Sequence, residues 1–448
     1  MRRQLLSELK KWKAQKPEYR KPLVLTGARQ IGKTYLLKHF AKSEFPNYHY
    51  FNFEFDKNLH GIFESDLNPQ RIIQFLSLHS DTVINKHDLI IFDEIQACPL
   101  AITSLKYFNE NLPDQAVCVA GSLLGLELNP GSYPVGKIEY LNMFPMTFRE
   151  FAEALGDNES LSLADECLVN KEKLPEFIHA RLWNRLKEYF IVGGMPEAVE
   201  AYKNSQGTDL ITRIEKVRAI QYDIVRSHMA DMTKHAGKEN SMHIEQLWHN
   251  IPVQLSREID SSVKKFQFKN IIPKINRYPE LMGVIHWLNK ANLIIEVPIA
   301  HSAQTPIKAY TKDNIFKLYM YDVGILSSMI DLKPQSILES DYGTYKGFFA
   351  ENFVCQELAA AQGSKEHLYS WKEDSAEVEF ILNKESNLIP LEVKSGLRVH
   401  AKSAKVFMKK YNSPYRITLS GHNINLDYEH NVMHYPLYLA STIINANI

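Results

Sequence analysis

The sequence has few cysteines, and they are far apart. Its 448 residues contain only Cys98, Cys118, Cys167 and Cys355, and no two of them form a C-x-x-C pair. This spacing argues against a disulfide framework and against a cysteine-based zinc site. Isolated cysteines are typical of buried thiols in a reducing compartment, so we expect a cytoplasmic protein.

Long apolar runs are also missing. No stretch approaches the ~18 consecutive apolar residues of a membrane-spanning helix, and residues 1–16 lack the apolar centre of a secretion signal. In that segment Leu5, Leu6, Leu9 and Trp12 recur at helical spacing, which predicts an amphipathic helix. We therefore expect no membrane partner.

The chain carries no excess charge of either sign. Basic and acidic residues number 52 each, so no global field attracts nucleic acid, and any basic surface has to be local. The 17 histidines show no spacing typical of metal ligands. Hydrophobic residues make up 45%, which is typical of a globular chain, and the length predicts about three domains.

The most specific motif is GARQIGKT at residues 27–34, which fits the phosphate-binding pattern G-x-x-x-x-G-K-[ST]. A strand-like run precedes it at 23–26 and a helical run follows at 35–40. In such a loop the backbone N–H groups surround phosphates, Lys33 reaches the β- and γ-phosphates, and the Thr34 hydroxyl ligates Mg²⁺. The predicted nucleotide-binding residues are Gly27, Ala28, Arg29, Gln30, Ile31, Gly32, Lys33, Thr34 and Tyr35.

Two acidic residues follow another expected strand. Residues 89–92 are apolar, and Asp93 and Glu94 come directly after them. In the second half of a nucleotide-hydrolysing site, Asp93 would hold Mg²⁺ directly or through water, and Glu94 would act as general base on the attacking water. A further strand ends at Ser122, whose hydroxyl would either contact the γ-phosphate or cap a helix.

Strand-like and helical runs alternate through the first 155 residues. This alternation predicts an α/β fold, a parallel sheet covered by helices on both faces, with ligands at the carboxyl ends of the strands. The expected strands lie at 23–26, 48–55, 89–92, 116–120 and 137–142.

These segments resemble the AAA-type predicted ATPases of bacteria and archaea. The resemblance covers nearly the whole chain and implies ATP and Mg²⁺ as cofactors, an AAA+ core at 1–155 and a helical lid at 156–235. Relatives commonly have Gly-Arg where this chain has Gly136-Lys137, so the arginine finger stays open between Arg149 and Arg29, and the chain is either an oligomer or a monomer. The segments that carry the resemblance are 27–34, IIFDEIQ (90–96), AGS (120–122), FPMTFREF (144–151) and FIVGGMPEAV (190–199).

Residues 236–330 suggest a winged helix. Helical patterns at 244–251 and 278–291 precede alternating runs at 293–299 and 307–310, which predict the two strands of a wing. The basic residues nearby either contact DNA or RNA phosphates or form a solvated face, and winged helices also bind proteins. These basic residues are Lys264, Lys265, Lys269, Lys274 and Arg277.

Residues 331–448 contain charged residues on an expected β-hairpin. The runs 376–382 and 388–394 predict a β-hairpin, and the period of two puts Glu392 and Lys394 on one face. Together with Glu379 and Glu351, this arrangement resembles the PD-(D/E)xK nuclease superfamily. The resemblance implies that Glu379 and Glu392, helped by Glu351, bind a metal and that Lys394 stabilises the attacking water. Glu379 stands where aspartate is usual, so an inactive nuclease-like domain is the alternative.

The sequence thus predicts Mg²⁺-dependent ATP hydrolysis coupled to nucleic-acid binding or processing by the C-terminal modules. The main alternative is a nucleotide-dependent switch that binds a protein partner and carries an inactive nuclease-like domain. A third hypothesis is a metal-dependent nuclease that ATP only regulates.

Overall fold

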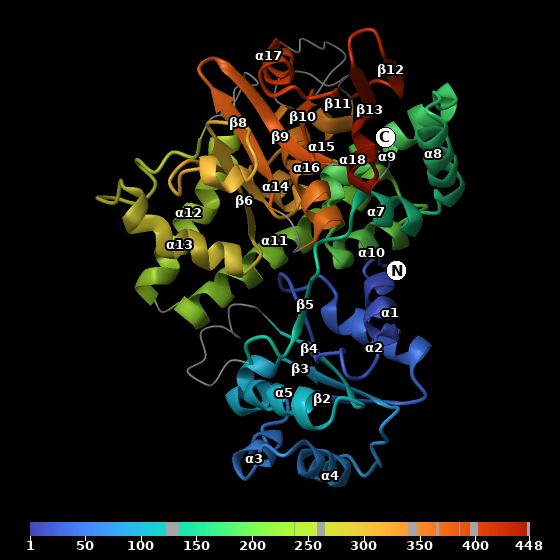
Figure 1. The fold of residues 1–448 in the computed structure, drawn as a ribbon, viewed down its shortest axis with the longest axis vertical. Coiled ribbons are helices and arrows are strands. Elements are labelled where there is room, and N and C mark those ends of the chain that lie inside the picture. The colour runs from blue at the N-terminus through green and yellow to red at the C-terminus, as the bar shows by residue number, and fades with distance from the viewer. Residues whose placement is uncertain are drawn as a thin grey trace. The chain divides into compact units, whose positions relative to one another are not determined.

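A computed structural model describes residues 1–121, 134–236, 238–257, 265–338, 347–363, 367–384, 386–394 and 402–445. The chain forms two compact units, Met1–Phe144 and Pro145–Ile448, each with its own sheet (Figure 1). Within the described residues, no helix is both long and apolar enough to cross a membrane.

Unit 1 is the predicted parallel sheet with helices around it. In the described part of the unit, the strands follow the order β2-β3-β4-β1-β5, so β4 separates β1 from β3. The strands are β1 (Leu23–Thr26), β2 (Tyr48–Asn52), β3 (Leu89–Asp93), β4 (Ala116–Ala120) and β5 (Glu139–Asn142). The helices are α1 (Leu6–Ala14), α2 (Lys33–Glu44), α3 (Leu59–Glu64), α4 (Pro69–His79) and α5 (Pro99–Asn111), with the 3₁₀ turn η1 (Ile95–Ala97) after β3.

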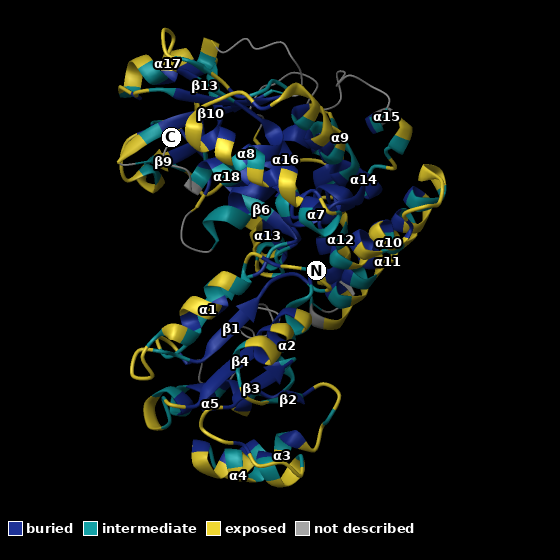
Figure 2. Ribbon diagram, turned by 90° about the vertical axis from the view of Figure 1, so that its right-hand side faces the viewer, coloured by how far each residue is buried: buried dark blue, intermediate teal, exposed yellow. Residues whose placement is uncertain are grey.

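The core of unit 1 fixes the middle strands of this sheet. All residues of β1, β3 and β4 are buried (Figure 2), as expected of parallel strands covered on both faces. An aromatic cluster packs beneath β3: the ring centroid of Phe92 lies 5.5 Å from that of Phe53 and 6.2 Å from that of Phe108. The carboxyl end of β3, which carries Asp93, is therefore held rigidly.

Unit 2 contains a mixed sheet and most of the helices. The described strands follow the order β12-β13-β11-β10-β9-β8-β6-β7. They are β6 (Ile294–Ala300), β7 (Phe316–Met320), β8 (Tyr369–Glu373), β9 (Ala376–Lys384), β10 (Asn387–Val393), β11 (Arg416–Ser420), β12 (Asn425–Asp427) and β13 (Val432–Pro436). The predicted hairpin at 376–394 is present, with Leu391 opposite Phe380.

The helices of unit 2 precede, interrupt and follow its strands. The first group is α7 (Phe148–Ala154), α8 (Asn158–Asn170), α9 (Glu176–Val192), α10 (Pro196–Asn204), α11 (Leu210–Ala236), α12 (Lys238–Ser256) and α13 (Tyr278–Lys290). The second group is η2 (Ile307–Tyr310), α14 (Val323–Met329), α15 (Pro334–Leu338), α16 (Gly347–Gln362), α17 (Lys402–Tyr411), η4 (Leu437–Leu439) and α18 (Ala440–Asn445).

The predicted second strand of a wing at 307–310 is wrong. These residues form the 3₁₀ turn η2, because Pro306 starts a turn in which the Ala309 N–H donates to the Pro306 carbonyl (3.0 Å). The strand that pairs with β6 is β7, and β6 also pairs in parallel with β8, placing Ile299 beside Ser370. The sheet therefore continues across residue 330, where the sequence suggested a boundary between two modules.

Two segments that carry the family resemblance, 144–151 and 190–199, meet in the core of unit 2. The Met146 N–H donates to the Gly194 carbonyl (2.7 Å), and the Gly194 N–H donates to Asp322 Oδ2 (2.7 Å). The Phe148 N–H donates to Glu357 Oε1 (2.8 Å). Burial raises the pKa of Asp322 to about 6 and that of Glu357 to about 7. Residues 145–151, expected in the first domain, are thus tied by hydrogen bonds into unit 2.

Candidate nucleotide-binding site

The glycine-rich loop links the carboxyl end of β1 to the start of α2. Gly27 (φ 138°) and Gly32 (φ 90°) adopt positive φ values, which glycine tolerates best. A Cβ atom on Gly27 would lie 2.3 Å from the Met143 carbonyl oxygen and 2.5 Å from Ile31 Cδ1. The loop therefore packs too closely against the residue after β5 for any side chain at position 27.

Lys33 is the first residue of α2, and its ammonium group folds back over the loop. Lys33 Nζ donates to the carbonyl oxygens of Gly27 (2.9 Å) and Ala28 (2.8 Å). The amino end of α2 adds partial positive charge at the same place. An anion at this loop would meet both the ammonium and the N–H groups at the start of α2, which is the arrangement that binds phosphate.

Asp93, at the end of β3, accepts three hydrogen bonds. Its Oδ2 accepts from Thr34 Oγ1 (2.9 Å) and from the Tyr50 hydroxyl (2.6 Å), and its Oδ1 accepts from the Glu94 N–H (3.1 Å). Partial burial, together with the hydrogen bond to Asp93, raises the pKa of Tyr50 to about 12. Tyr50 therefore stays protonated and orients the carboxylate toward Thr34.

The hydroxyl of Thr34 and the carboxylate of Asp93 suit Mg²⁺. Hydroxyl, carboxylate and water oxygens are the ligands that this ion prefers, and it usually keeps several waters. Since both oxygens of Asp93 already accept hydrogen bonds, the residue fits a role in which it holds the ion through water. The donor set thus fits the predicted metal position.

Glu94 is fixed by a residue that sequence reasoning did not assign. It has φ 50°, a left-handed conformation that is uncommon outside glycine. The Gln96 amide donates to Glu94 Oε2. A Cβ atom on Gly121 would lie 2.7 Å from Gln96 Oε1, so glycine at 121 leaves room for this amide. The position of Gln96 in the IIFDEIQ segment was the signal available in the sequence.

The other loop residues that were predicted to bind nucleotide differ in their exposure to solvent. Arg29 is half-buried, Gln30 is exposed with φ 62°, and Tyr35 is exposed. Ser122 lies outside the described residues. Arg3, which the sequence did not single out, braces the loop because its guanidinium donates to the carbonyl oxygens of Ile31 (3.0 Å) and Phe144 (2.5 Å).

Of the two arginine-finger candidates, Arg29 lies in the glycine-rich loop of unit 1 and Arg149 carries an ion pair. Arg149 lies in unit 2 and pairs with Asp165. Lys137, which replaces the arginine of relatives, pairs through Nζ with Glu110 Oε1 at 3.0 Å.

The carboxylates of the nuclease-like motif form a second, buried group in unit 2. Lys317 Nζ lies 2.8 Å from Glu351 Oε2, and both side chains are at most 9% exposed. Lys394 Nζ donates to Glu379 Oε1 (3.4 Å). The Oε2 atoms of Glu379 and Glu392 are buried and accept no hydrogen bond from the described residues. Lys317 was missed because a lysine within a strand gives no sign of its partner.

Burial dominates the ionisation of the carboxyl groups in this cluster. It raises the pKa of Glu379 to about 7, against the attraction of the Lys394 ammonium, and raises the pKa of Glu392. For Lys394, the neighbouring carboxylates outweigh burial and raise its pKa. Among the described residues, no three or more His, Cys, Asp or Glu side chains gather to hold a metal ion. Glu351 is instead bound to Lys317.

Family models match three parts of the chain. Residues 19–152 match an AAA domain. Residues 184–336 and 346–438 each match a domain of unknown function (DUF8612 and DUF4143). No curated protein matches the chain by sequence. The first match confirms the predicted AAA-type P-loop domain.

Solved structures show weak similarity. The Walker-type ATPase PABY2304 of Pyrococcus abyssi is 14% identical with a TM-score of 0.45, over 74% of this chain and 95% of that chain. The Orc1 protein of Aeropyrum pernix, solved with DNA, is 11% identical with a TM-score of 0.29, over 74% and 93%. AMPPCP-bound DnaA from Aquifex aeolicus is 15% identical with a TM-score of 0.28, over 64% and 85%.

Proposed function

We propose that the AAA-type domain at residues 19–152 binds ATP with Mg²⁺ and hydrolyses it. The observation that carries the proposal is the contact between Thr34 Oγ1 and Asp93 Oδ2 (2.9 Å). This contact brings the metal-binding ends of two distant motifs together beside Lys33. Glu94, the predicted base, is the next residue along the chain.

Each side chain has a distinct task in this proposal. Lys33 and the loop N–H groups hold the β- and γ-phosphates. Thr34 and, through water, Asp93 hold Mg²⁺, which neutralises charge on the phosphates. Glu94, oriented by Gln96, positions the attacking water and accepts its proton.

ATP turnover of single variants tests this assignment. We expect Lys33→Ala to abolish turnover, and Glu94→Gln to lower kcat by about 10²–10⁴-fold while ATP still binds, because a general base contributes about that factor. Lys42→Ala is the matched control, since Lys42 is an exposed lysine of the same helix and should turn over ATP normally. Unchanged turnover in Lys33→Ala would refute the site.

We also propose that unit 2 engages nucleic acid. The exposed basic residues Lys265, Lys269, Lys274 and Arg277 support this role, because phosphate contacts of lysine and arginine supply most of the affinity for nucleic acid. The orphaned carboxylate oxygens of Glu379 and Glu392 favour a bound cation, because a buried carboxylate oxygen without a partner is costly. The Lys317–Glu351 ion pair favours the alternative of an inactive nuclease-like domain in a protein-binding switch.

Strand cleavage separates the two versions of unit 2. Labelled DNA and RNA are incubated with the full chain and Mg²⁺ or Mn²⁺, comparing Lys394→Ala with the exposed control Lys405→Ala. Cleavage that only Lys394→Ala abolishes supports a metal-dependent nuclease. Absence of cleavage in every sample leaves the inactive nuclease-like domain.

A further inference from the structure

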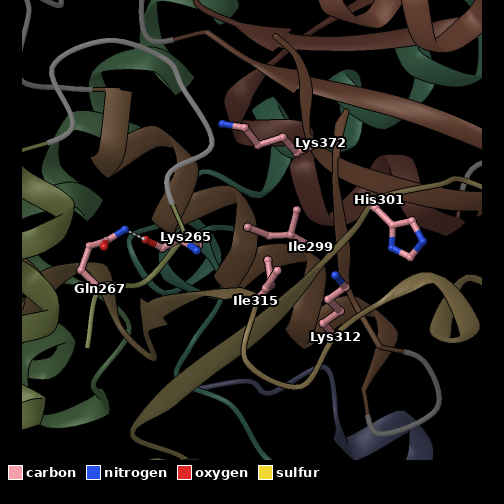
Figure 3. Close-up of a pocket in the computed structure, with 7 residues that line it drawn as sticks. All are labelled: Lys265, Gln267, Ile299, His301, Lys312, Ile315 and Lys372. Carbon is pink, nitrogen blue, oxygen red and sulfur yellow. Dashed lines mark hydrogen bonds between the residues drawn. The ribbon is translucent and has the colours of Figure 1, made fainter. Parts of the chain in front are cut away.

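A basic pocket opens beside strands β6 and β8 of unit 2. Its volume is about 440 Å³, within the range of small-ligand sites. In Figure 3, Ile299 and Ile315 lie together in the middle of the group, and the nitrogen-bearing side chains stand around them. The residues that line the pocket are Lys265, Gln267, Ile299, His301, Lys312, Ile315 and Lys372.

The walls of the pocket are tied together by backbone hydrogen bonds. The Phe266 N–H donates to the Phe316 carbonyl (2.8 Å), which fixes the segment of Lys265 against β7. The Ile299 N–H donates to the Ile315 carbonyl (3.0 Å), and the Ile315 N–H donates to the Lys312 carbonyl (3.0 Å). The lysines therefore project from anchored segments.

The charge of the pocket is positive. Three lysines and a histidine line it, and no carboxylate is among its lining residues. Lys372 Nζ lies 3.2 Å from Glu377 Oε2, opposite it on β9, so one of the three ammonium groups is partly neutralised. Lys265 and Lys312 come from separate segments and bring two further positive charges to one opening. Several ammonium groups around a cavity attract a polyanion or a phosphate.

The apolar floor adds a second requirement. Ile299 is buried and Ile315 is half-buried. A ligand that fills the pocket therefore needs an uncharged part that packs against these two side chains. His301 adds a planar ring to the lining, and aromatic side chains stack on bases. A nucleotide combines a phosphate with a planar base, whereas inorganic phosphate has no apolar part.

We propose that this pocket binds a nucleotide phosphate together with its base, supplied by a single strand of nucleic acid or by a free nucleotide. Lys265 and Lys312 contact the phosphate, and the base lies over Ile299 and Ile315. The inference rests on the proposed nucleic-acid role of unit 2, and it requires neither ATP hydrolysis nor strand cleavage. The pocket lies on the sheet that also carries Glu379, with β8 next to β9.

Fluorescence anisotropy with labelled single-stranded dT12 tests the pocket. The full chain is used without ATP and with EDTA, so neither turnover nor cleavage contributes. The double variant Lys265→Gln/Lys312→Gln is compared with Lys405→Gln/Lys409→Gln, which removes the same charge from exposed lysines of α17 outside the pocket. Losing two single-strand phosphate contacts is expected to weaken binding roughly 25-fold at 0.1 M salt, at a slope of about 0.7 per contact.

A second variant keeps the charge and fills the cavity. We expect Ile315→Phe to weaken dT12 binding at least about fivefold, because the larger side chain displaces one base from the pocket, with an unchanged melting temperature as the check on folding. Calorimetric titration with dTMP distinguishes the sources: a free nucleotide is the ligand if dTMP binds and dT12 does not. Equal losses in both lysine double variants would overturn the pocket while leaving the nucleic-acid role standing. If wild type binds neither probe, that role fails as well.

Discussion

Gly194→Ala tests the close backbone contact between Gly194 and Met146 in the core of unit 2. Gly194 does not have a left-handed φ, so its cost on substitution comes from packing alone. A Cβ atom there would lie 2.1 Å from the Met146 carbonyl oxygen and 2.7 Å from the Met146 nitrogen. Both neighbours are backbone atoms, so the chain itself has to move by about 1 Å to reach ordinary contact.

The expected loss follows from that movement. Overpacking of this kind costs about 1–3 kcal/mol. Two hydrogen bonds of Gly194, to the Met146 N–H and to Asp322 Oδ2 (2.7 Å each), weaken at the same time and add about 1 kcal/mol each. The free energy of unfolding of unit 2 should therefore fall by about 3–5 kcal/mol, which lowers its melting temperature by roughly 5–8 °C.

Calorimetry of the full chain measures the melting temperature, and a second glycine variant that should raise stability is the control. Gly283 lies within α13, and no atom lies within 4 Å of its Cβ position. Gly283→Ala should stabilise unit 2 by up to about 1 kcal/mol because alanine favours helix. If Gly194→Ala melts within about 1 °C of wild type, the contact between Gly194 and Met146 is not present.

Two further predictions concern a buried carboxyl and the proposed base. Because burial raises the pKa of Glu357 to about 7, its contribution to stability is complete below its unfolded pKa and is lost as pH rises through about 7. Between pH 4.5 and 8, the free energy of unfolding of the wild type, measured with urea, should therefore fall by about 3 kcal/mol more than that of Glu357→Gln. An equal fall in both proteins would contradict the burial argument. Gln96→Ala should lower kcat about tenfold with ATP affinity unchanged, because Glu94 loses one orienting hydrogen bond; a loss of affinity alone would show that Gln96 serves binding.

The N-terminal unit was predictable because its signals are local. The loop at 27–34, the strand before it and the helix after it are contiguous, and the run 89–92 with Asp93 announces both a buried strand and an acid at its end. The run at 307–310 was misassigned because it is too short to distinguish a strand from a turn. A run of four residues with three apolar side chains fits a strand and a turn equally well, and Pro306 favoured the turn.

Other features were invisible because their partners are distant in the chain. Tyr50 is one polar residue of a strand until β2 lies beside β3 and its hydroxyl reaches Asp93. Glu351 suggested a metal ligand until Lys317 was placed 2.8 Å from it. A sequence shows that a charged residue is present but not which opposite charge it contacts in the core. For a buried charge, that ion-pair partner determines whether the group is available for another role, such as binding a metal.

The sequence by itself determined that this protein has a phosphate-binding loop followed by an acidic strand end, because these are properties of adjacent residues. Tertiary structure decided that Thr34 and Asp93 touch, that Gly121 leaves room for the Gln96 amide, and that Gly194 has no room for a side chain. It also placed three lysines from separate segments around one cavity. Such features depend on distances between residues far apart in the chain, and those distances are set by packing of the whole unit.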